Sequence, residues 1–319
     1  MAEPEGKLER YGRGEFLESL RAQLGLDSAP TLIRHNTNLI YDGGTYVIRL
    51  TPNSFRAADE VARELAWLGF VSRQTPAVVR LLDSFSPNPR QLEFHGEAFT
   101  VTVFEKVDGV PIPDEHWNED HFQRLGALTG FLHRVSQRYV APPGQELLAW
   151  DASPEASLSR NLPDDDRALP ALVERTFEWL NRLPRAPETY GPIHYDIHQG
   201  NYLLAADGRI VLFDFENACL GHHLDDIAVA MFYARQHALS RNSANFDDTF
   251  LTAFWCGYKT QRPIPTQGLE QLPWFLLNRG LIVYAYLLKI WPSERNDAQR
   301  RYLELVEQGI AHERRVLGL

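Results

Sequence analysis

The hydrophobic positions divide the chain into a first part with strand-like patterns and a second part with helical ones. Segments 38–41 and 45–50 have strand-like sequences on either side of the turn-forming residues 42–44, and 45–50 alternates with a period of two, which predicts a β-hairpin. In the second strand this alternation separates two faces, one formed by Tyr46, Ile48 and Leu50 and the other by Val47 and Arg49.

The remaining elements follow from the same patterns. In the first part we expect further strands at 32–35, 78–82 and 99–104, a turn at 86–89, and helices at 15–24 and 55–70. After a Gly- and Pro-containing linker at 108–113, apolar residues at helical spacing predict helices at 119–138, 168–182, 224–238, 246–258, 271–291 and 297–316. The chain is therefore predicted to be α+β, with a small sheet-rich lobe at 1–105 and a larger, mostly helical lobe at 106–319.

Composition supports a folded protein and excludes several classes. Of the 319 residues, 44% are hydrophobic, which is enough for a full core. No apolar run has the length of a membrane span, and the polar residues 1–5 do not resemble a signal peptide, so we predict a cytoplasmic protein without membrane attachment. Two cysteines cannot form a disulfide framework, and a net charge of −10 argues against nucleic acid as a partner. The oligomeric state cannot be predicted from these data.

The strongest chemical signal is a loop near the middle of the chain. Residues 194–201 read H-Y-D-I-H-Q-G-N, and an apolar strand ending in D-F-E places Asp214 thirteen residues after Asn201. Phosphoryl transfer from a nucleotide needs a carboxylate that orients the accepting hydroxyl, and an amide and a second carboxylate that hold the metal ion. The loop and the strand supply these groups in the required order.

These motifs resemble those of the aminoglycoside phosphotransferase family, whose loop typically reads H-G-D-x-H-x-x-N. The resemblance is sharp over 191–230, and it is moderate over 36–109, where N-x-x-Y, V-I-R-L, E-L-A-W-L and V-D-G occur in order. It implies a bilobal protein-kinase-like fold and an ATP- and Mg²⁺-dependent transfer to a hydroxyl of a small molecule.

The resemblance also implies roles for individual residues. Asp196 would be the catalytic carboxylate, and Asn201 and Asp214 would ligate the metal ion. His198 is expected to have a structural role or to approach the substrate. Asp226 would brace the catalytic loop, which leaves Asp225 to line a pocket, and Glu216 would lie near the second metal ion or near solvent.

The first lobe departs from the kinase pattern at its phosphate-binding cation. No lysine occurs between residues 8 and 105, and Arg49 stands at the matching position in V-I-R-L, where it keeps the charge but changes the geometry. Its expected partner is Glu64, with Glu60 as the substitute. Asn38 lies where a phosphate-covering loop would be. The hinge that would pair with the base of the nucleotide includes Glu105 and Val107.

The acceptor is predicted from charge alone. Residues 107–319 contain 28 acidic and 20 basic residues, a net of −8, so we expect a hydroxylated substrate with at least one amine, contacted by Asp225 or Glu216.

Two other functions fit parts of the sequence. A metallohydrolase could use His194, Asp196 and His198, with additional ligands from 222–226. A nucleotide-binding pseudokinase would explain Arg49, although Asp196 and its metal-binding partners are intact.

Overall fold

The structure is a computed structural model that describes residues 11–12, 14–94, 96–160, 162, 168–239, 246–262 and 266–319. Residues 1–5, on which the predicted location depends, lie outside this part. The chain forms two compact units. Unit 1 includes the chain up to Gly109 and adds 140–146 and 205–213, whereas unit 2 consists of 110–139, 147–204 and 214–319.

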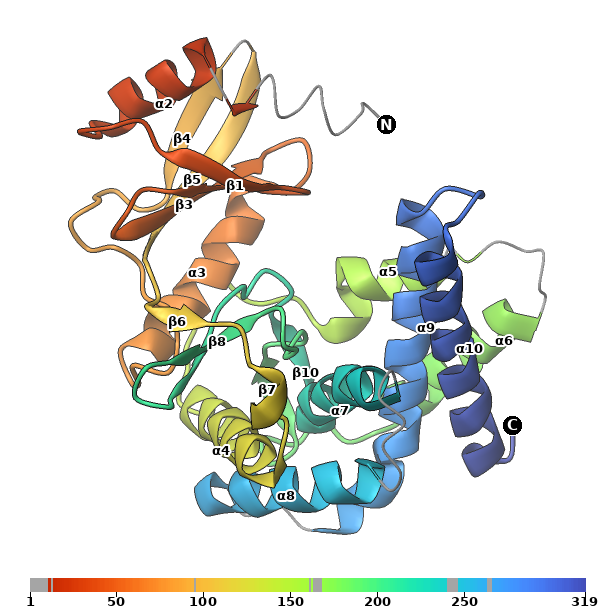
Figure 1. Cartoon of the computed structure of the whole chain (residues 1–319). Helices are drawn as coiled ribbons and strands as arrows, with labels where there is room; N and C mark the ends of the chain where they lie inside the picture. Colours follow the sequence, from red (N-terminus) through yellow and green to blue (C-terminus); the bar gives the residue numbers. More distant parts are fainter. Residues whose placement is uncertain are drawn as a thin grey trace. The chain divides into compact units, whose positions relative to one another are not determined.

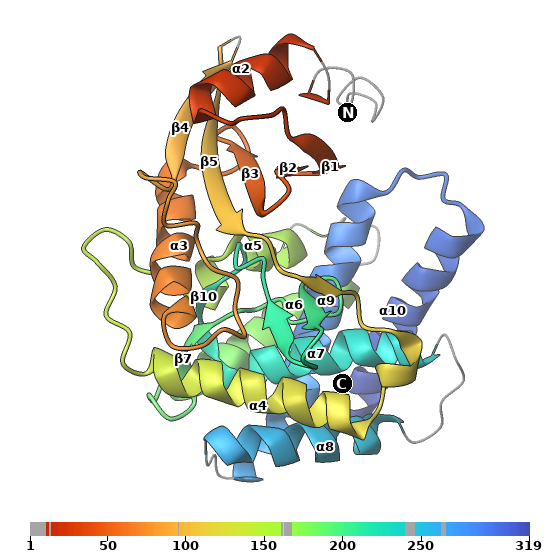
Figure 2. The same ribbon diagram turned by 60° about the vertical axis from the view of Figure 1, so that its left-hand side comes forward.

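Unit 1 contains a five-stranded antiparallel sheet in the order β1-β2-β3-β5-β4 (Figure 1; all five strands are labelled in Figure 2). The strands are β1 (Thr31–His35), β2 (Leu39–Asp42), β3 (Tyr46–Pro52), β4 (Arg90–Phe94) and β5 (Glu97–Glu105). The predicted hairpin joins β2 and β3, in which Leu39 pairs with Leu50 and Asp42 with Val47. Asp42 Oδ1 accepts the Gly44 N–H at 2.8 Å, which closes the turn.

The two faces of this sheet carry different helices. Ile48 and Leu50 lie in a core cluster with Phe16 and Leu20 of α2 (Glu15–Leu24), and Tyr46 packs against this cluster. Arg49, on the opposite face, bonds to Glu64 of α3 (Ala58–Ser72). The predicted alternation along β3 is therefore confirmed. The sheet has an apolar side and a side with a buried cation.

One predicted element of unit 1 is wrong, and one strand was not predicted. Segment 78–82 is not a strand, because Val78 bridges to Leu212 and Leu81 bridges to Phe104, so no ladder can form along it. The edge strand β4 was missed because its sequence is mostly polar and only Leu92 is buried. The hydrogen-bonding groups of β5 recruit it into the sheet.

Unit 2 is mostly helical, as predicted. Its α-helices are α4 (Glu119–Ser136), α5 (Pro154–Arg160), α6 (Ala168–Asn181), α7 (His223–Leu239), α8 (Phe246–Gln261), α9 (Leu272–Ile290) and α10 (Asp297–Leu317). Of these, only α5 was not predicted. The 3₁₀ turns are η1 (Asp114–His116), η2 (Trp150–Ala152) and η3 (Thr266–Gln271).

Helices α4 and α8 run side by side (Figure 2). A Cβ at Gly126 of α4 would lie 1.9 Å from the Phe254 carbonyl oxygen, and one at Gly257 of α8 would lie 1.8 Å from that of Gln123. Glycine at both positions therefore permits direct backbone contact, which no larger residue would allow.

Short strands lie around the loop that carries the predicted chemistry. β7 (Tyr190–Ile193) and β10 (Cys219–His222) form an antiparallel pair, in which Ile193 is the partner of Cys219. Three further strands occur where the chain passes between the units, namely β6 (Gly109–Val110), β8 (Tyr202–Ala205) and β9 (Ile210–Leu212). Within the described residues, no helix is both long enough and apolar enough to cross a membrane.

Candidate functional site

Unit 1 contains the expected ion pair. Arg49 donates from Nη1 and Nη2 to the two carboxylate oxygens of Glu64 at 2.8 and 3.0 Å, and Arg56 bonds to Glu64 as well. Burial raises the pKa of Glu64, but the two guanidinium groups outweigh this effect and hold the pKa below its usual value. Glu60 is not the partner of Arg49, since its carboxylate accepts the Ala57 N–H at the start of α3.

The other candidate nucleotide contacts have separate positions in unit 1. Asn38 is 8% exposed, and its Oδ1 accepts a hydrogen bond from Thr51 at 2.8 Å. Glu105 is the exposed last residue of β5, and its N–H donates to the Arg80 carbonyl at 2.9 Å. Val107 follows it as a half-buried residue. Their contacts with a nucleotide stay predictions.

In unit 2, the H-x-D loop begins directly after β7 and is fixed by one buried carboxylate. Asp226, in the first turn of α7, accepts the N–H of His194 at 3.0 Å and that of Tyr195 at 2.6 Å. It also accepts from Nε2 of His133, on α4, at 3.0 Å. The predicted bracing role of Asp226 is confirmed, and His133 is a third member of the network that the sequence did not reveal.

Two residues of the site have left-handed backbone conformations. Tyr195 has φ 66° and Asp214 has φ 63°, and neither is glycine. Such a conformation costs about 1 to 3 kcal/mol in a non-glycine residue, and it persists only where neighbouring contacts enforce it. The related loops carry glycine at the position of Tyr195, so Asp226 and the burial of the Tyr195 ring must supply the restraint.

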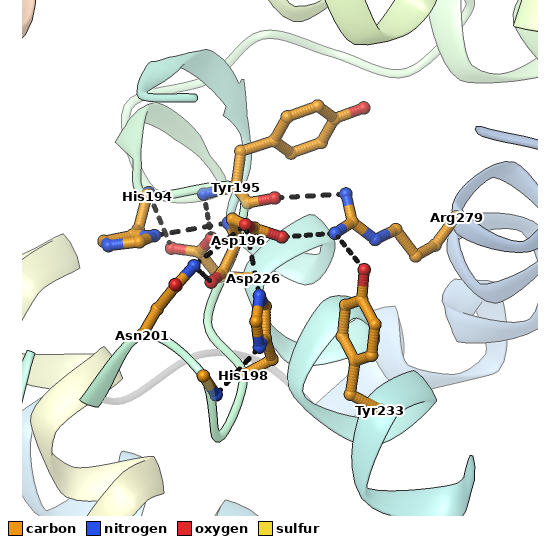
Figure 3. Close-up of polar contacts among 9 residues, drawn as sticks. His194, Tyr195, Asp196, His198, Asn201, Asp226, Tyr233 and Arg279 are labelled. Atoms are coloured by element: carbon orange, nitrogen blue, oxygen red, sulfur yellow. Dashed lines mark hydrogen bonds and ion pairs between the residues drawn. The ribbon is translucent and has the colours of Figure 1, made fainter. Parts of the chain in front are cut away.

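Asp196 lies at the centre of the loop, with donors at both of its oxygens (Figure 3). Asn201 Nδ2 donates to Oδ2 at 2.9 Å, and His198 Nε2 lies 3.3 Å from the same oxygen. Oδ1 forms an ion pair with Arg279 of α9. Burial raises the pKa of Asp196, but Arg279 and the neighbouring histidines outweigh this and hold the pKa far below its usual range. The carboxylate is therefore ionised at neutral pH.

The candidate metal ligands flank this carboxylate in sequence. Both hydrogen bonds of the Asn201 side chain are donated by Nδ2, to the Asp196 main-chain oxygen and to its Oδ2. Within the described residues Oδ1 of Asn201 thus stays available, and an amide oxygen with a carboxylate oxygen suits a hard divalent cation. Asp214 directly follows unit 1 in sequence, after β9, and is the first residue of the next segment of unit 2.

The three candidate substrate residues differ in exposure. Asp225 is 3% exposed, and its burial, together with the neighbouring Asp226, raises its pKa well above the usual value. Glu216 and His198 are half-buried. His198 Nδ1 accepts the Gly200 N–H at 2.9 Å, so the ring also shapes the loop. Of the three, Asp225 is the least accessible to a substrate.

The histidines of the alternative metal site are engaged in other contacts. His194 Nδ1 accepts the Asp196 N–H at 3.2 Å, and His223 stacks on His133 with the ring centroids 4.3 Å apart. Across the described ranges, no group of three or more His, Cys, Asp or Glu side chains has a metal-binding arrangement.

Three residues around Asp196 were not predicted from the sequence. Arg279 and Tyr233 come from α9 and α7. Glu155, on α5, has a buried Oε2 without a hydrogen-bond partner in the described part of the chain, and burial raises its pKa. The charges of Arg279 and Asp196 also affect this pKa. No sequence motif connects these positions with the loop, and only contact between remote segments reveals them.

The fold and the loop together define a kinase-like phosphotransferase with an alcohol group as acceptor. The model of the phosphotransferase enzyme family matches residues 34–272, which is more than half of the chain, and the chain therefore belongs to this family. The resemblance to aminoglycoside phosphotransferases that the motifs predicted is thus confirmed.

Two relatives are similar in sequence. The amicoumacin kinase of Bacillus subtilis (strain 168) is 26% identical over 253 residues, which cover 77% of this chain and 74% of the relative. A homoserine kinase of Pseudomonas aeruginosa (strain LESB58) is 31% identical over 161 residues, 49% of this chain and 48% of the relative.

Two solved structures have the same fold. One is an amicoumacin kinase in complex with AMP-PNP, Ca²⁺ and Ami, with a TM-score of 0.83, 22% identity and coverage of 96% of both chains. The other is a microcompartment-associated aminopropanol kinase, with a TM-score of 0.72, 22% identity and coverage of 94% of this chain and 97% of its own. The predicted kinase-like fold is confirmed.

Proposed function

We propose that this small-molecule kinase transfers the γ-phosphoryl group of ATP, with Mg²⁺, to a hydroxyl of an amine-bearing alcohol. The observation that carries the proposal is the environment of Asp196. The side chain is ionised and held from both of its oxygens, which suits a carboxylate that orients a hydroxyl. A relative solved with AMP-PNP and Ca²⁺ supports the use of a nucleotide and a divalent cation.

Each residue of the site has a part in this reaction. Asn201 Oδ1 and Asp214 would hold the metal ion, which neutralises charge on the phosphates when it is bound. Arg49, oriented by Glu64, supplies the cation for the nucleotide phosphates from unit 1. Asp196 binds the acceptor hydroxyl and takes its proton late, because a loose transition state needs little deprotonation before the phosphorus moves.

The class of acceptor is inferred from charge and from the relatives. Homoserine and aminopropanol, the substrates in two of the relatives' names, both carry an amine beside a hydroxyl. The acidic excess of residues 107–319 would attract the ammonium group of such a substrate, with Glu216 as a candidate contact. Asp225 is the weaker candidate, because its side chain is buried.

The proposal is tested by measuring ADP release and phosphorylated product with five acceptors: amicoumacin A, 1-amino-2-propanol, homoserine, choline and spectinomycin. At least one should stimulate ADP release, and its KM should rise with salt, because screening acts over about 8 to 10 Å. Asp196→Asn should lower kcat by about two to four orders of magnitude, with a similar KM for ATP.

Two outcomes would contradict the proposal. Tight nucleotide binding without acceptor-dependent ADP release would indicate a pseudokinase. Near-normal turnover by Asp196→Asn would show that this loop is not the catalytic one.

A further inference from the structure

The two oxygens of Asp196 are not equivalent. Oδ2 accepts from Asn201 Nδ2 at 2.9 Å and faces His198 Nε2 at 3.3 Å. Because Nδ1 of His198 accepts the Gly200 N–H, a neutral ring carries its proton on Nε2 and directs it at Oδ2. A carboxylate oxygen has two lone pairs, so both lone pairs of Oδ2 already face donors.

Oδ1 has one such partner, the Nη2 group of Arg279 (Figure 3). No other hydrogen bond or ion pair of Oδ1 occurs within the described chain, so one lone pair of this oxygen has no donor. The acceptor hydroxyl can therefore be received at Oδ1 without the loss of an existing hydrogen bond.

The guanidinium of Arg279 is held by contacts from the loop and from α7. Arg279 is 5% exposed on α9, and Nη2 also donates to the Tyr233 hydroxyl of α7 at 2.9 Å. Nη1 donates to the Tyr195 carbonyl of the loop at 3.4 Å, and the Tyr233 ring lies 5.1 Å from the guanidinium carbon. Nη2 thus has both of its hydrogens engaged, one by Asp196 and one by Tyr233.

We propose that Arg279 is a positioning residue, which orients the Asp196 carboxylate so that the open lone pair of Oδ1 receives the acceptor hydroxyl. The inference rests on the proposed function for its kinetic consequence. The structural part of the inference, that Arg279 orients the Asp196 carboxylate, does not depend on any acceptor. Tyr233 supports this role because its hydroxyl accepts the other hydrogen bond of Nη2.

Four variants separate positioning from a general contribution to stability. Arg279→Gln removes the charge and the planar fork, and Arg279→Lys keeps the charge with a single nitrogen. Tyr233→Phe removes the hydroxyl that holds Nη2 and leaves Asp196 untouched. Arg235→Lys is the matched control, because Arg235 pairs with Asp247 and Glu313 in the same unit and makes no contact with Asp196.

The first measurement is kinetic, with MgATP and whichever of the five acceptors gives the wild type its highest kcat/KM. Arg279→Gln should lower kcat about 10- to 100-fold, because misalignment of a reacting group by about 1 Å has effects of this size. The KM for ATP should stay within about threefold, and more than one ADP should form per phosphorylated acceptor, because water needs less precise alignment. Arg279→Lys should recover part of kcat, Tyr233→Phe should lower it less, and Arg235→Lys should keep the wild-type kcat.

The second measurement is structural and needs no acceptor. Crystal structures would be determined for the wild type, Arg279→Lys and Tyr233→Phe. In Arg279→Lys the Asp196 carboxylate should be rotated or split between orientations. An unchanged carboxylate in that variant would overturn the proposal, as would a kcat within threefold of wild type for Arg279→Gln. If Arg235→Lys and Arg279→Lys lost kcat equally, Arg279 would contribute only to the stability of the protein.

The two proposals fail in different ways. If the wild-type protein phosphorylates none of the five acceptors, the proposed function fails, and the crystal structures still decide the role of Arg279. If the wild type is active and the Arg279 variants match it, only the role of Arg279 fails.

Discussion

Asp226→Asn is the substitution with the clearest structural consequence. The two oxygens of Asp226 accept three hydrogen bonds, from the His194 N–H, the Tyr195 N–H and His133 Nε2. An asparagine has one oxygen, so it can keep at most the two bonds made at Oδ2. Its amide group would then face the Tyr195 N–H across a contact that is now 2.6 Å.

The expected cost follows from these bonds. A hydrogen bond to a charged group contributes about 1.5 to 3 kcal/mol, and an unsatisfied buried donor adds to its loss. Together these give a destabilisation of about 3 to 5 kcal/mol. For a chain of this size the entropy of unfolding is about 0.7 kcal/mol/K, so this lowers Tm by about 4 to 8 °C. The turnover number should fall too, because Tyr195 would relax from its left-handed conformation and move the adjacent Asp196.

The assay is thermal unfolding by circular dichroism, combined with kcat and KM for ATP. Asp225→Asn is the matched control, since Asp225 is also buried but accepts one N–H, that of His222. The control should lose less stability than Asp226→Asn. The reasoning would be refuted if Asp226→Asn unfolded within 2 °C of the wild type, or if both variants lost stability equally.

Three further predictions concern the nucleotide, the metal ion and pH. Arg49→Ala should raise the KM for ATP and lower kcat, and Arg49→Lys should be partly active; normal use of ATP by Arg49→Ala would place the phosphate clamp elsewhere. Asp214→Ala should lose the Mg²⁺ dependence of nucleotide binding in calorimetry, and wild-type affinity in both conditions would exclude Asp214 as a ligand. Burial lowers the pKa of His121 and of His222 to about 4. The contribution of the two neutral rings to the free energy of unfolding is therefore fully present above pH 6.5. It is lost as pH falls toward 4, because the unfolded chain takes up these protons first. Each should cost about 1.4 kcal/mol per pH unit in this window, and the double variant His121→Phe/His222→Phe should show a shallower fall of Tm between pH 6.5 and 5; an unchanged slope would contradict the assignment.

Local patterns in the sequence determined most of the elements and the centre of the site. The hairpin at 42–44 depends on residues that are adjacent in the chain, and the long helices depend on spacings of three and four residues, so both are visible without a structure. The order of His194, Asp196 and Asn201 is likewise contained in one loop. The partner of Arg49 was predictable because α3 follows β3 directly along the chain.

Only the tertiary structure decided which remote groups surround this loop. Arg279 lies 83 positions after Asp196, and His133 lies 93 positions before Asp226, yet each meets its partner in a buried contact. The edge strand β4 was also decided this way, because its polar sequence forms a strand only where β5 offers hydrogen-bonding groups. A local pattern records the periodicity of an element and the order of residues in a loop. It does not record which face of a distant helix will pack there, because that depends on burial summed over the whole unit.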